Sequence, residues 1–285
     1  MTSLLTDKQI ERFNDDGFVL VERIIEPAQA RSAADRYERL FAGDFETGLY
    51  PDEWNWRDGR DPTDHTRQIC NAWKSDYTIA ELVLSQAIGQ ACARAGGWPG
   101  ARLYQDNVIW KPPGAKAIGF HQDNSYLDFI VPDEMVTCWI ALDDTTAEGG
   151  TIDYARGSHR WGASPPIGQF HAPEDPHVEL RAAAREAGGA VNLQSIVAPA
   201  GGGAFHHGWI WHGSGMNRGT APRRALVIHC ISSGARFHET NRGYIYGRYK
   251  RFGDTVMDES FFPILWTEDG HRSAFIDVYL SEKSG

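Results

Sequence analysis

Apolar residues in the first hundred positions recur with the period of a helix. Thr6 is followed three residues later by Gln9, as in a capping box, and the apolar Ile10 and Phe13 share one face before Gly17. This pattern predicts a helix that ends at Gly17. The other elements predicted here are a strand over 18–25, helices over 27–41 and 79–96, and a long loop over 42–66.

Beyond residue 100 the apolar runs become short and are broken by Gly, Pro and Asp. Such runs predict β-strands, and because they follow the helices instead of alternating with them, they favour a sandwich or jelly-roll barrel. A helix near 177–187 interrupts the series and is interpreted as part of an insertion over 162–192. The predicted strands lie at 102–110, 117–123, 135–142, 150–155, 195–199, 204–212 and 223–232.

The order of these elements defines the expected fold class. We predict a mainly β protein with a double-stranded β-helix core, the jelly-roll or cupin-like barrel, flanked by N-terminal helices. No linker separates two differently composed halves, so we expect a single domain over residues 1–285. It divides into a helical part at about 1–98, the core at about 99–235 and a C-terminal extension at 236–285.

Composition and charge narrow the class of partner. The 285 residues are 41% hydrophobic and 23% charged, with a formal net charge of −10 and no Lys/Arg block, which argues against nucleic-acid and membrane partners and favours a small molecule. No apolar run has the length of a signal or membrane segment, so we expect a cytoplasmic protein. The four cysteines include no CxxC pair and are expected to be reduced thiols.

His121 and Asp123 stand at the end of the predicted strand 117–123. Because side chains two positions apart in a strand point to the same side, both can meet one metal ion. An imidazole and a carboxylate suit iron(II), and one more histidine would complete a 2-His-1-carboxylate triad with open coordination positions. A surface histidine beside a turn aspartate is the alternative interpretation.

A second candidate pair lies in the segment FHHGWIWHGSGMNRGTAPRRALVIHC. His212 ends one predicted strand, and Arg223, eleven residues later, begins the next, so the Gly/Asn/Pro region between them predicts a hairpin. The hairpin would bring an imidazole to the metal and a guanidinium one strand away, where it could bind the distal carboxylate of a dicarboxylate. The alternatives are a hydrogen-bonded core histidine and a surface arginine.

Several motifs together resemble the phytanoyl-CoA dioxygenase family of iron(II)/2-oxoglutarate oxygenases. NVIWKPPG is followed by FHQDNSY, then by WIALDDTTAEGGTIDYARGSH and WHGSGMNRGTAPRRAL, in the family's order and spacing. The resemblance runs from the TDKQIERFNDDGFVLV opening to RRALVIHC. It implies iron(II) as the metal, with 2-oxoglutarate and O2 as cosubstrates.

The resemblance also assigns a role to each candidate residue. His121, Asp123 and His212 are implied to bind iron, and Arg223 is implied to pair with the C5 carboxylate of 2-oxoglutarate. The positions implied to line the 2-oxoglutarate site are Asn107, Trp139 and Ser214.

The expected activity is hydroxylation of a C–H bond in a small metabolite, with release of succinate and carbon dioxide. Halogenating relatives replace the ligand carboxylate by a small residue, so Asp123 favours hydroxylation. Two other classes stay open: a cupin-like metalloenzyme that does not use 2-oxoglutarate, which would leave Arg223 unexplained, and a non-catalytic binding barrel.

Other histidines and aromatic residues are candidates for supporting roles. Strand parity places His206 on the same side as His212, which favours either a supporting role beside the metal ligands or a place in the core, whereas His159 is expected to be structural. Aromatic residues could wall a pocket for an apolar or cationic molecule, although simple packing is the alternative. These residues are Tyr50, Trp54, Trp56, Tyr126, Tyr244 and Tyr246.

Overall fold

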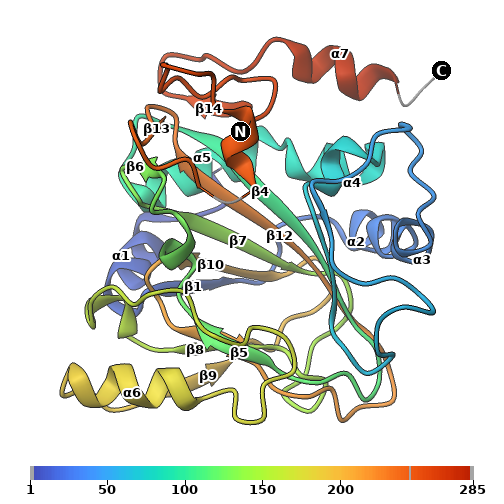
Figure 1. Ribbon diagram of the computed structural model, residues 1–285, viewed down its shortest axis with the longest axis vertical. Coiled ribbons are helices and arrows are strands. Elements are labelled where there is room, and N and C mark those ends of the chain that lie inside the picture. The colour runs from blue at the N-terminus through green and yellow to red at the C-terminus, as the bar shows by residue number, and fades with distance from the viewer. Residues whose placement is uncertain (1–2, 244, 283–285) are drawn as a thin grey trace.

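The computed structural model describes residues 3–243 and 245–282 (Figure 1). Its largest element is an eight-stranded antiparallel sheet. In spatial order the strands are β1 (Phe18–Val21), β10 (Gly203–His207), β7 (Val136–Ala141), β12 (Arg223–Ser232), β4 (Gly100–Lys111), β3 (Arg67–Cys70) and β2 (Glu53–Trp54), and β14 (Ile264–Thr267) pairs with β4.

A smaller antiparallel sheet covers one face of the larger one (Figure 1). Side chains from both sheets pack in one buried cluster, which includes Trp139, Tyr154 and Val227. The space between the two sheets therefore holds both an apolar core and the candidate site. The strands of the smaller sheet, in order, are β5 (Ile118–His121), β11 (His212–Ser214), β8 (Ile152–Ala155) and β9 (Leu193–Ser195).

The first helix forms as its sequence predicts. Helix α1 (Asp7–Asp16) begins at a capping box made by Thr6 and Gln9 and ends at Gly17, whose φ of 83° is in the left-handed region that favours glycine. It lies against β1 and β10 at one edge of the larger sheet. The strand that follows is shorter than predicted and ends at Val21.

The two longer predicted helices are each broken in two. In the later segment the break lies at Ser85, whose hydroxyl accepts a hydrogen bond from the main chain of the next turn and begins a new helix. Asp76 begins the preceding helix in the same way. Arg36, at the break in the earlier segment, pairs with Asp76 at 2.6 Å and ties the helices together. The four helices are α2 (Pro27–Ala34), α3 (Tyr37–Phe41), α4 (Tyr77–Val83) and α5 (Gln86–Gly96).

The prediction of a single strand over 204–212 is wrong. Strand β10 ends at His207 and β11 begins at His212, and the two strands belong to different sheets. The chain turns at Gly208, where an added Cβ would lie 1.9 Å from the Asn124 side-chain oxygen. A side chain at this turn would force the Asn124 side chain to move, which favours glycine here. His212 begins β11 and does not end the predicted strand.

The predicted hairpin between His212 and Arg223 is also wrong. Strand β11 pairs with β5 and β8, whereas β12 pairs with β4 and β7, so the two segments lie in opposite sheets. Long-range pairing has overridden the local turn signals of residues 213–222. The predicted strand at 195–199 overlaps β9 only at Ser195.

The remaining elements lie in the insertion and toward the C-terminus. The predicted insertion helix is confirmed as α6 (Val178–Glu186), which contacts β5 beside the smaller sheet (Figure 1). All four cysteines are buried and free, and no helix among the described residues is long and apolar enough to span a membrane. The other elements are β6 (Ile130–Val131), β13 (Arg236–Phe237) and α7 (Phe275–Ser281).

The core beneath the larger sheet should be sensitive to truncation. Phe205 in β10 is fully buried, so Phe205→Ala should lower the free energy of unfolding by about 3–5 kcal/mol through lost burial and a cavity. Leu20 in the adjacent β1 is 37% exposed, and Leu20→Ala should cost clearly less. Urea unfolding of both variants measures the difference, and equal losses would contradict this placement of the core.

Candidate metal centre

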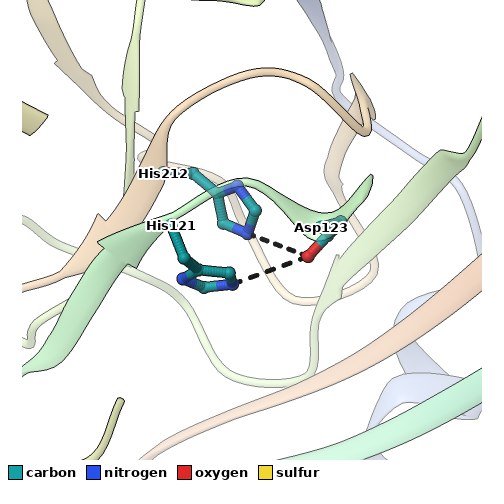
Figure 2. A group of neighbouring side chains, drawn as sticks. All are labelled: His121, Asp123 and His212. Carbon is teal, nitrogen blue, oxygen red and sulfur yellow. Dashed lines mark ion pairs between the residues drawn. The ribbon is translucent and has the colours of Figure 1, made fainter. Parts of the chain in front are cut away.

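His121, Asp123 and His212 meet at one end of the smaller sheet (Figure 2). His121 is the last residue of β5 and His212 the first of β11, and the two are directly opposite in the strand register. The Oδ1 atom of Asp123 lies 3.5 Å from the Nε2 atom of each histidine. One ligand atom from each residue falls within 4.8 Å of the others, so the three can hold one ion.

The chain presents His121 and Asp123 on the same side because the residue between them is extended. Gln122 has φ −114° and ψ 131°, although Asp123 already begins a short 3-10 helix. The Gln122 side chain points the other way and donates to the carbonyls of Gly162 and Trp209. These bonds hold the His-x-Asp turn against the loop before β11.

Main-chain carbonyls fix the tautomer of both histidines. The Nδ1 atom of His121 lies 2.9 Å from the Gly119 oxygen, and that of His212 lies 3.0 Å from the Ile210 oxygen. A carbonyl only accepts, so each Nδ1 carries the proton and each Nε2 presents a lone pair toward Asp123. Burial and the neighbouring His121 lower the pKa of His212 well below its usual value, which keeps it a neutral ligand.

The second oxygen of Asp123 is occupied by protein donors. Its Oδ2 atom accepts from the Thr137 hydroxyl at 2.9 Å and from the His206 Nε2–H at 3.0 Å. Tyr154 donates its hydroxyl to His206 Nδ1 at 2.7 Å, which sets that tautomer. Burial alone would raise the pKa of Asp123, but the surrounding histidines and hydrogen bonds lower it well below its usual value. Only Oδ1 is left to face the two ligand histidines.

His206, Thr137 and His229 form a row across three strands of the larger sheet. Thr137 is the register partner of both histidines. The hydrogen bonds run in one direction: Asn107 donates to His229 Nε2 at 3.0 Å, His229 Nδ1 donates to Thr137 at 2.8 Å, and Thr137 donates to Asp123. The expected role of His206 beside the ligands agrees with its position, whereas sequence reasoning missed Thr137 and His229.

A cavity of about 920 Å³ opens over this group. The candidate metal ligands and the candidate cosubstrate-binding residues all line it, although they come from different sheets. Of the aromatic candidates, Tyr126 and Tyr246 line the cavity, and Tyr244 lies outside the described residues. Trp56 is buried in the core, Trp54 packs against that core, and Tyr50 is 72% exposed. The lining candidates are His121, Asp123, His212, Asn107, Trp139, Ser214 and Arg223.

Arg223 enters this cavity from the larger sheet. Its side chain is buried and donates from Nε and Nη2 to the Gly150 carbonyl at 3.2 and 2.7 Å. Among the described residues it has no ion pair with a carboxylate, and burial lowers its pKa to about 10. At neutral pH it therefore remains a guanidinium without a counterion, which suits the carboxylate of a ligand.

The donor set fits iron(II) and a dicarboxylate. Two neutral imidazoles and one carboxylate oxygen form a facial triad that suits iron(II) and leaves positions open for further ligands. Thr137 and His206 hold the other Asp123 oxygen, which favours coordination through Oδ1. Arg223 supplies a cation in the same cavity.

One family model and several known proteins are similar to this chain over most of its length. The family model described as phytanoyl-CoA dioxygenase (PhyH) matches residues 13–225. A methylphosphonate hydroxylase of Gimesia maris is 24% identical over 80% of this chain and 81% of that protein. Phytanoyl-CoA dioxygenase domain-containing protein 1 of Mus musculus is 22% identical over 80% of this chain and 91% of that protein.

A solved structure shares the fold. The non-heme alpha-ketoglutarate-dependent carbocyclase SnoK from nogalamycin biosynthesis superimposes with a TM-score of 0.71 at 20% sequence identity. The match covers 92% of this chain and 98% of SnoK.

Removing a ligand should abolish metal binding. Asp123→Ala leaves two histidines without the carboxylate, so iron(II) affinity should fall by more than about 100-fold, beyond the loss typical of supporting residues. His171→Ala is the matched control, because His171 is a partly buried histidine that lines the same cavity outside the triad. Anaerobic equilibrium dialysis measures both affinities, and an iron(II) affinity in Asp123→Ala equal to that of the control would contradict the ligand set.

The donors to Asp123 Oδ2 should also affect metal affinity. Thr137→Val keeps the side-chain shape but removes the hydroxyl, and iron(II) affinity should fall roughly 10- to 100-fold. Thr145→Val is the control, since Thr145 is equally buried but bonds to the carbonyls of Ile196 and Ala198. The same dialysis applies, and equal affinities in the two variants would show that Thr137 does not support the ligand.

Proposed function

The chain belongs to the phytanoyl-CoA dioxygenase family, and from this premise we propose that it is an iron(II)- and 2-oxoglutarate-dependent dioxygenase that hydroxylates a C–H bond of a small molecule. We propose a double-stranded β-helix as the finer description of the two packed sheets, within a single domain over residues 1–285. The shared fold of the solved relative supports this architecture. We also propose a cytoplasmic location.

In this proposal the cavity holds the metal at one side and the cosubstrate between the sheets. His121, Asp123 and His212 would bind iron(II), and Arg223 would bind the distal carboxylate of 2-oxoglutarate. Their presence in one cavity supports these assignments. The residues that would line the rest of the cosubstrate site are Asn107, Trp139 and Ser214.

Bound iron(II), 2-oxoglutarate and O2 would supply the oxidising power, with succinate and carbon dioxide released and one oxygen atom transferred to the substrate. The protein's own residues orient the metal ligands and the cosubstrate. The three-ligand set leaves coordination positions free, and the donors to Asp123 Oδ2 keep that carboxylate in one orientation. Arg223 fixes the far end of the cosubstrate and thereby its orientation at the metal.

The observation that carries this proposal is the unpaired Arg223 guanidinium in the same cavity as the triad. A cupin-like metalloenzyme without 2-oxoglutarate would have no use for this cation. A non-catalytic binding barrel would have no need of two histidines with fixed tautomers facing one carboxylate oxygen. Asp123 also provides the ligand carboxylate that favours hydroxylation.

The substrate class proposed is a small molecule that reaches the metal past Tyr126, which is 38% exposed at the cavity wall. The Gimesia maris relative is named for a phosphonate, and the solved relative for a ring closure. The cavity volume of about 920 Å³ has room for a metabolite beside 2-oxoglutarate.

Turnover should depend on 2-oxoglutarate and on Arg223. We expect the iron-loaded protein to convert 2-oxoglutarate to succinate slowly even without substrate, and Arg223→Leu should raise the KM for 2-oxoglutarate roughly 100-fold through loss of a charge-assisted contact. Arg224→Leu is the matched control, because Arg224 pairs with Asp143 at 2.6 Å and its side chain is 23% exposed.

Succinate measured against 2-oxoglutarate concentration gives these constants. Oxygen consumption that does not require 2-oxoglutarate would support the cupin-like alternative. A protein that binds iron but consumes neither oxygen nor 2-oxoglutarate would support the binding barrel.

A further inference from the structure

A second buried cation stands next to Arg223. Lys111, the last residue of β4, is its direct register partner on the neighbouring strand. Lys111 is 0% exposed and Arg223 is 4% exposed. Like charges directly opposite each other in a sheet are destabilising, and burying a charge is costly unless it is paired. An anion bound between the two side chains would therefore stabilise the charged pair.

No protein carboxylate forms an ion pair with either cation among residues 3–243 and 245–282. Lys111 Nζ donates to the Ser214 hydroxyl at 2.8 Å and to the Gly215 carbonyl, while Arg223 donates to the Gly150 carbonyl. Asp153 acts on both cations electrostatically and raises their pKa values. It forms no ion pair with either of them among the described residues, and its carboxylate accepts a hydrogen bond from Ser195. Burial and the neighbouring Arg223 lower the pKa of Lys111 well below its usual value, so an anion bound beside it would favour the charged form.

Ser214 connects Lys111 to the cavity. Its oxygen accepts from the ammonium, which has no lone pair to accept in return, so the serine proton is free for another acceptor. Ser214 and Arg223 both line the cavity. An anionic ligand held by Arg223 in this cavity could accept the serine proton.

We propose that Lys111 is a positioning residue for 2-oxoglutarate, which orients the Ser214 hydroxyl toward the distal carboxylate and adds a second positive charge beside Arg223. This inference rests on the proposed function and deepens it. A purely structural role, in which Lys111 ties the end of β4 to the loop after β11, is the alternative. The two roles predict different effects on ligand affinity. Only in the positioning role does the loss of Lys111 weaken ligands that carry a distal carboxylate and spare those that lack it.

The test compares two ligands that differ at that carboxylate alone. The full-length iron(II)-loaded protein is titrated anaerobically in a calorimeter with 2-oxoglutarate and with 2-oxopentanoate, which has the same chain length but a methyl group at C5. Lys111→Met should weaken 2-oxoglutarate binding roughly 10- to 100-fold, as loss of a charged hydrogen-bond donor predicts, and leave 2-oxopentanoate binding unchanged. Lys111→Gln, which keeps an N–H donor but no charge, should give an intermediate loss for 2-oxoglutarate.

Lys116→Met is the matched control, because Lys116 lies in the loop after β4, is 49% exposed and pairs with Asp64. It should bind both ligands like the unmodified protein. Equal weakening of the binding of both ligands in Lys111→Met, or no weakening of either, would overturn the inference. If that variant does not fold, Lys111→Gln is judged by the same criterion, the ratio of its affinities for 2-oxoglutarate and 2-oxopentanoate. Failure of the unmodified iron-loaded protein to bind 2-oxoglutarate would refute the proposed function instead.

Discussion

The asymmetry of the Asp123 carboxylate is the constraint on which the site depends. One oxygen faces the lone pairs of His121 and His212, and the other accepts from Thr137 and His206. Since the two histidines lie at the end of the smaller sheet and the donors lie on the larger one, the carboxylate links the two sheets at this point. The His206–Thr137–His229 row exists because β10, β7 and β12 are adjacent and in register.

The two sheets divide the chemistry between them. The smaller sheet supplies both histidines and Ser214, and the larger sheet supplies Arg223, Lys111, Asn107 and Trp139. The two sheets share an apolar cluster, and the cavity has the candidate metal ligands at one side and Arg223 at the other only because the sheets face each other. The cost of burying Lys111 and Arg223 without a counterion is consistent with a site that awaits a dicarboxylate.

Local sequence signals predicted the parts of this structure that local physics decides. The capping box of α1, the strand-rich region and the His-x-Asp spacing all follow from short-range rules. The motifs that resemble the family indicated Arg223 and Ser214, which both line the cavity. The hairpin between His212 and Arg223 was predicted wrongly because strand pairing is set by distant partners. Thr137, His229 and Lys111 were missed for the same reason, since their significance depends on register across the sheet.

The most direct test of the central claim is an anaerobic titration of the metal-free protein with iron(II) and then 2-oxoglutarate, followed by visible absorption. If the triad and Arg223 form one cofactor site, a weak charge-transfer band should appear only when both are present, because 2-oxoglutarate then chelates the bound iron. A folded protein that binds iron(II) but gives no band at saturating 2-oxoglutarate would contradict the account.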